Sequence, residues 1–369
     1  MKTQIWASPG MYVQGYGELK NLGKYASPLG DSFMVIASTN RIRDLEGVIR
    51  ESFGDAAKLT FVASDSACVR SEIDRIAAIG REDESDLIIG MGGGKVIDTA
   101  KAVSKELNKK IIIVPTVAAS DAATTRCAVE YSEDGEELGE IPLAANPDLV
   151  VVDTEIIMKA PKRYLLAGLG DAMAKYVAAK TCYAGYQPSE LGAGVTEMAF
   201  AVAELSKKIM FENGELAMIA FDNGVMTKDL NKIIELNILI SGVACEVNGA
   251  TTDHSFYAGF TTLKNRETEM LHGEYVTFST LATMVLEGAP KEELDEYYDF
   301  CTRIGLPTTL EDLHLDYMDE DDFRQVGETV LECGPASHHP FEFTVEEAIA
   351  AMKVADSIGK MYKAGKRLI

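Results

Sequence analysis

Short apolar runs alternate with amphipathic stretches through the first 160 residues, and this alternation restricts the fold more than any other feature. Each run is brief, rich in β-branched side chains and bounded by Gly, Pro, Ser or Asp, as is typical of buried parallel strands. The runs cover 33–37, 59–63, 87–90, 111–114 and 149–152, with helical patterns such as 69–79 and 96–107 between them. Strands that alternate with helices predict an α/β fold with a mostly parallel sheet.

The pattern changes near Ala160-Pro161, where Pro161 suits a first helical turn. Beyond this point strand-like runs almost disappear. Helical periodicity covers 164–181, 190–211, 230–247 and 345–361. We therefore expect an α/β domain over residues 1–160 and an all-helical domain over 161–369, which fits about 150 residues per domain.

The charge balance excludes several classes of partner. Lys and Arg total 35 and Asp and Glu total 58, a formal charge of −23. Such acidity argues against nucleic acids and anionic membranes, because their phosphates are repelled. No apolar run reaches the roughly 18 residues of a membrane span, and the first residues lack the apolar core of a signal peptide. Six scattered cysteines without a CxxC pair favour free thiols and a cytoplasmic location.

Twelve acids lie between residues 292 and 322, against one base, Arg303. A run of like charges of this kind is typical of a solvated helical face and loop.

A glycine-rich turn follows the strand at 87–89, with the sequence Gly90-Met91-Gly92-Gly93-Gly94-Lys95, and a helix begins after it. Glycine lets a pyrophosphate approach the bare N–H groups and the positive end of a helix, and Lys95 adds a charge. The turn matches neither GxGxxG nor the P-loop pattern. The alternative is an ordinary tight turn, and phosphate binding is the favoured interpretation.

A second ligand-binding segment is predicted where the strand at 111–114 ends. Pro115 and the small polar residues up to Asp121 lie where open α/β sheets bind ligands. Asp134-Gly135, between strand-like runs at 126–131 and 137–142, then predicts a β-hairpin.

The chain has five histidines, all in the helical part; two of them are His254 and His272, and Asp171 lies early in a helical segment. Their spacing matches no local zinc signature. By spacing alone, a metal site and hydrogen-bonded core histidines both stay open.

Seven segments, in order over nearly the whole chain, resemble the glycerol dehydrogenases of the iron-containing alcohol dehydrogenase superfamily. They are SPGMYVQG, GMGGGKVIDTAKAV, PT…SDA, NPDLVVVDTEII, GLGDAMAKYVAAKTC, the His254 segment and LHGEYV. The resemblance implies a dehydroquinate synthase-like two-domain fold, with a dinucleotide-binding domain before a helical metal- and substrate-binding domain. It also implies a homo-oligomeric enzyme that passes hydride between NAD or NADP and a small polyol such as glycerol, giving dihydroxyacetone.

The same resemblance implies a divalent metal held by Asp171, His254 and His272. Iron-dependent relatives carry a further histidine four residues after the Asp, and here that residue is Lys175. Three ligands with an open position suit catalytic Zn²⁺, with Fe²⁺ as the alternative. Such a metal lowers the pKa of an alcohol, and the alcohol carbon then passes hydride to the nicotinamide.

The cofactor and substrate contacts are also implied by the resemblance. Asp121 is expected to contact a second substrate hydroxyl. The expected cofactor contacts are Ser38, Gly93, Gly94, Lys95, Asp98, Thr116, Ala119, Thr125, Cys127 and Tyr131.

Three departures from the family pattern qualify the ligands. NAD-specific members carry an Asp where this chain has Ser38, so a 2′-phosphate is not repelled and Ser38, Arg41 or Arg43 could hold it. We therefore hypothesise that NADP is accepted. Arg126 and Glu130 replace small or apolar residues, which leaves hydroxy acids, hydroxyketones and phosphorylated alcohols open as substrates.

Two other functions fit the residues less well. A cyclising synthase like dehydroquinate synthase needs several bases around the metal, and few occur here beyond Lys175. A non-catalytic nucleotide-binding protein has no reason to keep Asp171, His254 and His272 together.

Overall fold

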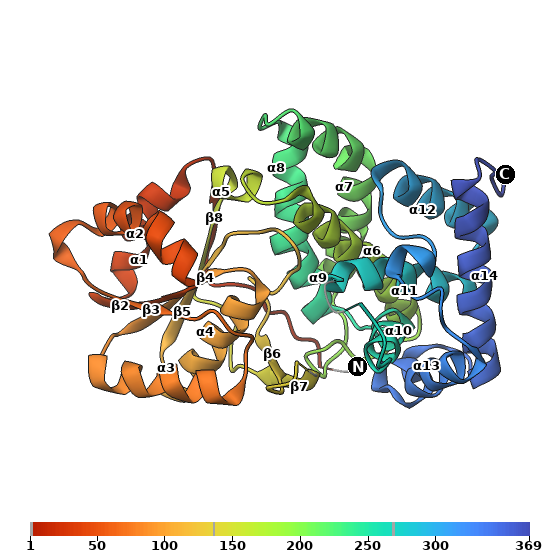
Figure 1. The fold of residues 1–369 in the computed structure, drawn as a ribbon, viewed down its shortest axis with the longest axis horizontal. Coiled ribbons are helices and arrows are strands. Elements are labelled where there is room, and N and C mark those ends of the chain that lie inside the picture. The colour runs from red at the N-terminus through yellow and green to blue at the C-terminus, as the bar shows by residue number, and fades with distance from the viewer. Residues whose placement is uncertain (1–2, 136, 268–269) are drawn as a thin grey trace. The chain divides into compact units, whose positions relative to one another are not determined.

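A computed structural model describes residues 3–135, 137–267 and 270–369. The chain divides into two units (Figure 1). One unit comprises Ala7–Pro161. The other comprises Lys162–Ile369 together with the described residues 3–6.

A six-stranded parallel sheet forms the centre of the first unit, in the order β1-β8-β5-β4-β2-β3. The strands are β1 (Tyr12–Gly15), β2 (Ser32–Ala37), β3 (Lys58–Ala63), β4 (Leu87–Gly92), β5 (Lys110–Pro115) and β8 (Leu149–Asp153). Every residue of β4 and β8 is buried, which explains apolar runs without alternation. The five predicted strands are confirmed. The unpredicted strand β1 is a half-buried edge strand, and its polar Gln14 hides any apolar run.

Helices cover both faces of this sheet (Figure 1). They are α1 (Leu22–Ala26), α2 (Thr39–Phe53), α3 (Arg70–Asp83) and α4 (Gly94–Leu107), with the short α5 (Thr154–Met158) after β8. Alternate strand residues such as Val35 and Ile89 pack against Ile49 and Phe53 of α2. Strand β4 carries Gly90, where a Cβ would lie 2.6 Å from that of Ala100, so α4 packs directly on the sheet.

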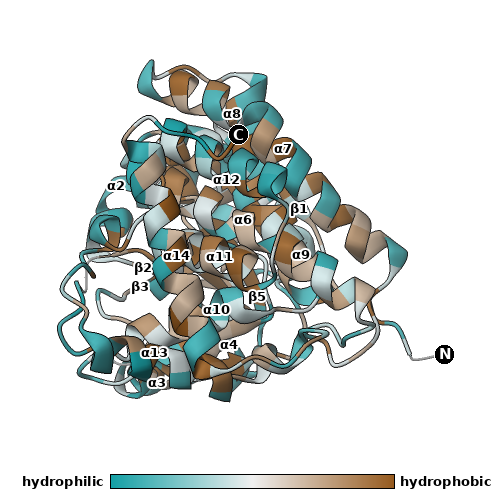
Figure 2. Cartoon of the chain, turned by 90° about the vertical axis from the view of Figure 1, so that its right-hand side faces the viewer, coloured by the Kyte–Doolittle hydropathy of each residue, from teal (hydrophilic) through white to brown (hydrophobic). Residues whose placement is uncertain are grey.

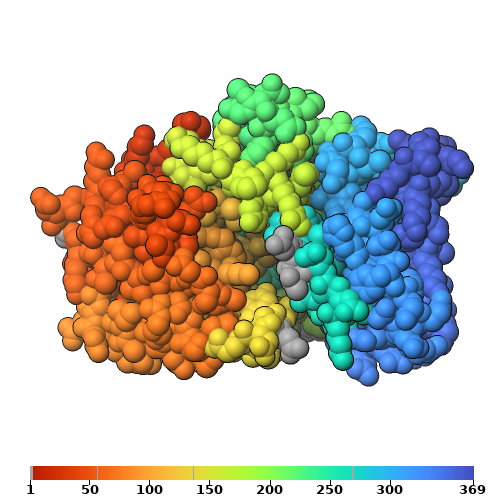
Figure 3. All heavy atoms as spheres, viewed as in Figure 1, coloured from red at the N-terminus to blue at the C-terminus, as the bar shows by residue number. Residues whose placement is uncertain are grey.

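The predicted hairpin is confirmed as antiparallel β6 (Cys127–Tyr131) and β7 (Glu137–Pro142). It lies at the surface of the first unit (Figure 3), and Leu138 is 63% exposed. The Glu130 carboxylate lies 3.8 Å from Nε of Arg70, on α3. The Glu130 carboxylate thus faces a base from a neighbouring helix.

The described residues of the second unit form no sheet, so the prediction of an all-helical part is confirmed. The helices are α6 (Lys162–Ala184), α7 (Glu197–Asp222), α8 (Lys228–Glu235), α9 (Ser241–Val247), α10 (Thr252–Thr261), α11 (His272–Leu286), α12 (Lys291–Ile304), α13 (Glu320–Glu332) and α14 (Val345–Lys363). A π-helical turn at Leu236–Ile240 joins α8 to α9. Helix α7 begins later than predicted, because the Thr196 hydroxyl caps it by accepting the N–H of Ala199.

Helix α11 is the buried centre of this unit. Residues 273–284 are all buried, which explains why its sequence is apolar or small all round. Phe256 and Phe260 of α10 pack beside Phe278 of α11 in one large core.

The acidic stretch at 292–322 is only partly the solvated face that its sequence predicts. Glu292 and Glu320 are exposed. Glu293, however, is bound by Lys180, and the Asp312 carboxylate accepts the N–H groups of Thr308 and Thr309. Glu293 thus joins two helices and Asp312 holds a loop. The prediction of a wholly solvated face is therefore wrong for these two acids.

Among the described residues, no single helix is both long and apolar enough to cross a membrane. One pair, 228–247 with 252–261, meets the criterion only when combined across a 106° bend.

Candidate active site

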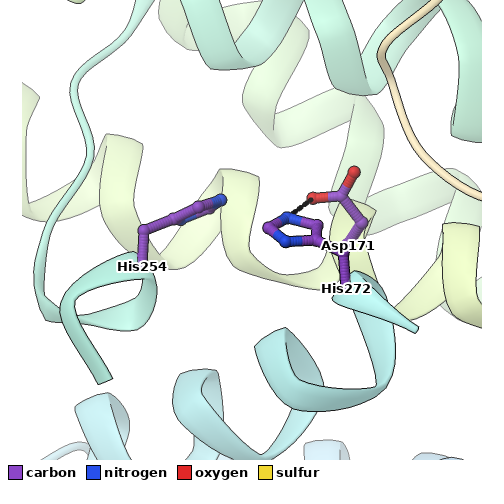
Figure 4. A group of neighbouring side chains, drawn as sticks. All are labelled: Asp171, His254 and His272. Carbon is purple, nitrogen blue, oxygen red and sulfur yellow. Dashed lines mark ion pairs between the residues drawn. The ribbon is translucent and has the colours of Figure 1, made fainter. Parts of the chain in front are cut away.

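Asp171, His254 and His272 converge in the second unit (Figure 4). Each offers one ligand atom, and these atoms lie within 4.8 Å of one another; no other such cluster of His, Cys, Asp or Glu occurs among the described residues. They come from α6, α10 and α11. Their side chains are 1%, 27% and 34% exposed, in that order, so a buried carboxylate faces two accessible imidazoles.

Two glycines let the helices of Asp171 and His272 approach. A Cβ at Gly273 would lie 1.8 Å from the Ala167 carbonyl oxygen, and one at Gly170 would lie 2.2 Å from Oγ1 of Thr277. Each glycine directly adjoins one of the two ligand residues. The close helix contact therefore places Nε2 of His272 3.7 Å from Oδ1 of Asp171.

A carboxylate orients His254. Nδ1 of His254 lies 2.8 Å from Oδ2 of Asp253, while the N–H and hydroxyl of Thr251 both donate to Oδ1 of Asp253 at 3.0 Å. Burial lowers the pKa of His254, but the Asp253 charge outweighs burial and the pKa is raised. An imidazole held in this way presents its other nitrogen to a metal.

Asp253 was not predicted as a functional residue. Its only sequence signal is its place next to His254, and neighbouring residues on a helix do not normally face each other.

Lys175 forms a buried ion pair with Asp171. Its Nζ lies 2.9 Å from Oδ1 of Asp171, and the two side chains are 3% and 1% exposed. Burial raises the pKa of the Asp171 carboxyl, but the Lys175 charge and the two imidazoles outweigh it, so the pKa lies well below its usual value. Asp171 is therefore ionised at neutral pH.

These donors fit a divalent metal. One carboxylate oxygen and two imidazole nitrogens form a typical donor set for zinc. Tetrahedral zinc ligands at 2.0–2.2 Å from the metal lie about 3.4 Å apart. The three donor atoms lie within 4.8 Å of one another, so side-chain rotations that bring them closer would let them hold the ion.

The adjacent histidines His338 and His339 bind the residues at the start of α10. Nε2 of His339 lies 3.0 Å from Oγ1 of Thr252, and Nδ1 of His338 lies 2.8 Å from the Ala250 carbonyl oxygen. Both therefore bind the segment that leads to His254.

The predicted nucleotide contacts gather at the carboxyl edge of the sheet in the first unit. The pairs Ala37↔Met91 and Gly92↔Pro115 place Ser38, Gly93 and Thr116 at the ends of three adjacent strands. Strands β3 and β5 lie on opposite sides of the β2–β4 pair, so the strand order reverses between β2 and β4. Ligands of open α/β sheets bind at such a reversal of strand order.

The glycine-rich turn is open on its outer side. No described side chain caps α4, and Lys95 is exposed. A Cβ at Gly94 would meet nothing within 4 Å, so packing does not require glycine there. An open glycine at the start of a helix is typical of turns that bind phosphates.

Lys101 of α4 holds the next predicted contacts from inside the unit. It is fully buried, and Nζ donates to the Ala122 carbonyl at 2.5 Å, Oγ1 of Thr125 at 3.1 Å and the Cys127 carbonyl at 2.8 Å. Three donors thus meet three acceptors. Sequence reasoning missed Lys101, whose signal is a lysine on the apolar face of a helix.

Three of the predicted cofactor contacts, Asp98, Thr125 and Cys127, take part in this packing of α4 on β6. Burial raises the pKa of Asp98 to about 7 against the Lys101 charge and the Val129 N–H. Burial also raises the pKa of Cys127 to about 12. Tyr131 is attached to the unit through its N–H, which donates to the Cys68 carbonyl at 2.8 Å.

The end of β2 carries Ser38, whose hydroxyl caps α2 by accepting the Arg41 N–H at 3.4 Å. The next residue, Thr39, donates its N–H to the Asp65 carboxylate at 2.9 Å. Arg43 pairs with Asp44 at 2.9 Å on the surface. An acid from the end of β3 therefore lies beside the position where this chain lacks the family's Asp.

Residues 9–154 match the family model described as iron-containing alcohol dehydrogenase. Glycerol dehydrogenase of Thermotoga maritima is 36% identical over 356 residues, 96% of this chain and 97% of that protein. Glycolaldehyde reductase of Halobacterium salinarum is 32% identical, with 97% and 98% covered. The crystal structure of glycerol dehydrogenase from Schizosaccharomyces pombe superposes with a TM-score of 0.94 at 28% identity, with 100% and 96% covered. The chain belongs to the iron-containing alcohol dehydrogenase family.

Family membership confirms the resemblance, the two-domain fold and an alcohol or polyol dehydrogenase activity. Enzymes of this family use NAD(P) and a divalent metal. A cyclising synthase is not favoured, since the relatives named above are a dehydrogenase and a reductase.

Proposed function

We propose that this dehydrogenase interconverts a small vicinal polyol, glycerol above all, and its hydroxyketone, with NAD(P) as the hydride carrier. The observation that carries the proposal is the convergence of Asp171, His254 and His272 in a chain with glycerol dehydrogenase relatives.

In this proposal the helical unit holds the metal and the substrate hydroxyl that the metal makes more acidic. Asp171, His254 and His272 are the metal ligands, with Asp253 as a positioning residue. A bound Zn²⁺, or Fe²⁺ in its place, supplies the Lewis acidity that makes a substrate hydroxyl more acidic. Asp121, from the α/β unit, is proposed to accept a hydrogen bond from the second hydroxyl, which selects vicinal diols over simple alcohols.

The α/β unit binds the dinucleotide. Gly93, Gly94 and Lys95 hold the pyrophosphate at the start of α4, because the turn is open and Lys95 is exposed. Ser38, Thr116, Ala119 and Tyr131 contact other parts of the dinucleotide. Asp98, Thr125 and Cys127 shape this site through the packing around Lys101.

We also propose that NADP is accepted, through Ser38, Arg41 or Arg43. Asp65 opposes this, because its carboxylate lies beside Thr39 and repels a 2′-phosphate. Steady-state kinetics with each coenzyme test the point: a large preference for NAD in kcat/KM contradicts the proposal.

The enzyme is further proposed to be a cytoplasmic homo-oligomer. All six cysteines lie in the described part of the chain and are free thiols. Helix α7 exposes Met198, Leu205, Leu216 and Ile219, and apolar patches follow this helix in Figure 2. Light scattering of the purified protein and of Leu216→Glu tests whether this face joins subunits; a monomeric wild type contradicts it.

A substrate panel tests the function itself. Glycerol, short diols, simple alcohols, hydroxy acids and glycolaldehyde are each assayed with NAD(H) and NADP(H), with and without added zinc, by absorbance at 340 nm. The proposal expects glycerol or another vicinal diol to give the highest kcat/KM, and His254→Ala to abolish turnover. A clear preference for hydroxy acids would overturn the substrate assignment.

A further inference from the structure

Lys175 stands one helical turn after Asp171 on α6, and it binds the carboxylate that the proposed function gives to a metal. Its Nζ lies 2.9 Å from Oδ1 of Asp171, with both side chains almost fully buried. The inference below therefore rests on the proposed metal site.

The ammonium and a divalent cation need the same carboxylate. The Asp171 side chain is 1% exposed, so it has little access to water as an alternative partner. A metal at the three donors lies about 2 Å from the Asp171 oxygen. It is then only a few ångströms from the Lys175 ammonium, and like charges repel strongly where water is scarce.

The Asp171 carboxylate has a second neighbour besides Lys175. His272 also approaches Oδ1 of Asp171, at 3.7 Å. The Asp253 carboxylate is bound to His254 and to Thr251. The negative charge available to a metal is therefore shared with Lys175.

We propose that Lys175 is a positioning residue that competes with the divalent metal for Asp171, so that its ammonium weakens metal binding and neutral side chains strengthen it. The consequence is a dehydrogenase whose metal occupancy follows the free metal concentration.

A purely structural role predicts the opposite. If Lys175 only stabilises α6, removing it disturbs Asp171 and leaves zinc binding unchanged or weaker. Metal affinity therefore separates competition from structural support, whereas activity alone does not.

The test compares full-length wild type with Lys175→Gln and Lys175→Met. The control is Lys180→Met, which removes a more exposed ion pair from the same helix: Lys180 is 35% exposed and lies 3.0 Å from Glu293. Each protein is stripped with a chelator, its fold is checked by circular dichroism, and zinc affinity is measured at one pH by competition with a chromophoric chelator.

Zinc should bind Lys175→Gln at least tenfold more tightly than wild type, and Lys180→Met within twofold of wild type. Zinc should also raise the Tm of Lys175→Gln more than that of wild type. Lys175→Gln keeps a hydrogen-bonding group near Asp171, so it serves if Lys175→Met does not fold.

Equal or weaker zinc binding by a folded Lys175→Gln overturns the inference, provided that wild type binds zinc and His254→Ala does not. If neither wild type nor Lys175→Gln binds zinc, the proposed metal site itself is wrong and the inference falls with it.

Discussion

At the residue scale, the site depends on side chains that hydrogen-bond to the proposed metal ligands. Asp253 bonds to the ring nitrogen of His254 that faces away from the ligand cluster. Because the same carboxylate accepts two bonds from Thr251, its own position is well defined.

Asp253→Asn should weaken zinc binding by about 10- to 100-fold, because the amide cannot supply the charge that orients the imidazole. Chelator competition measures this. Asp229→Asn is the control, since Asp229 accepts a bond from Asn213 on another pair of helices. Unchanged zinc affinity in Asp253→Asn would show that Asp253 does not position His254.

His339 makes stability depend on pH. Burial lowers the pKa of its imidazole to about 4, although Asp253 opposes the shift. The unfolded chain takes up this proton near pH 6.5. The unfolding free energy is therefore unaffected by this group above about pH 6.5. It decreases as the pH falls from 6.5 towards 4, and by pH 5 the decrease is about 2 kcal/mol.

Denaturant unfolding of wild type and His339→Gln at pH 7 and pH 5 checks this. The variant should lose about 2 kcal/mol less between the two pH values. Glu287, whose pKa burial raises to about 7, works in the opposite direction, and its Oε1 lies 3.4 Å from Nδ1 of His339. Equal losses in both would contradict the assignment.

At the scale of the elements, the main feature is the close contact of α6 and α11. The two helices meet at glycines, where no side chain separates them. Gly170 and Gly273 bring α6 and α11 together directly beside Asp171 and His272. Helix packing and ligand geometry thus depend on the same two positions.

Gly273→Ala should lower the unfolding free energy by about 3 kcal/mol, because its Cβ overlaps the Ala167 carbonyl oxygen. It should also weaken zinc binding by displacing His272. Gly47→Ala, in α2 with nothing within 4 Å of the added carbon, should instead stabilise by up to about 1 kcal/mol. Urea unfolding measures both, and a neutral Gly273→Ala would disprove the close contact.

Lys101 joins α4 to the segment between Ala122 and Cys127. Lys101→Met leaves these buried acceptors unsatisfied, at a cost of about 1–3 kcal/mol each. We expect the KM for the coenzyme to rise more than the KM for the polyol. The reason is that Lys101 connects α4, which begins at the glycine-rich turn, to Thr125 and Cys127 of the proposed dinucleotide site. The exposed Lys105→Met on the same helix is the control. An equal rise in both KM values would point to general destabilisation.

At the scale of the whole molecule, the two proposed ligands belong to different units. Bound ligands slow local opening of the structure that holds them. Hydrogen exchange should therefore show NAD(P) protecting 90–101 and 116–131, and zinc protecting 165–175 and 251–258. Zinc protection confined to the α/β unit would contradict the assignment of the metal to Asp171, His254 and His272.

Much of the fold could be read from local patterns. The five buried strands, the hairpin at Asp134-Gly135 and the long helices follow from apolar periodicity and turn residues, which act over a few neighbouring positions. Strand β1 and the π-helical turn were missed, because a short half-buried edge strand and one extra residue per turn leave little local signal.

The sequence alone identified the candidate ligands, since Asp171, His254 and His272 stand in segments that resemble the family, and it identified the glycine-rich turn at Gly93-Gly94-Lys95. Only the tertiary structure decided the partners of the buried charges. Lys101 meets three acceptors, Lys175 meets Asp171, and Asp253 meets the neighbouring imidazole. Buried charges must be paired wherever packing places them, and packing joins residues whose distance along the chain carries no record of their contact.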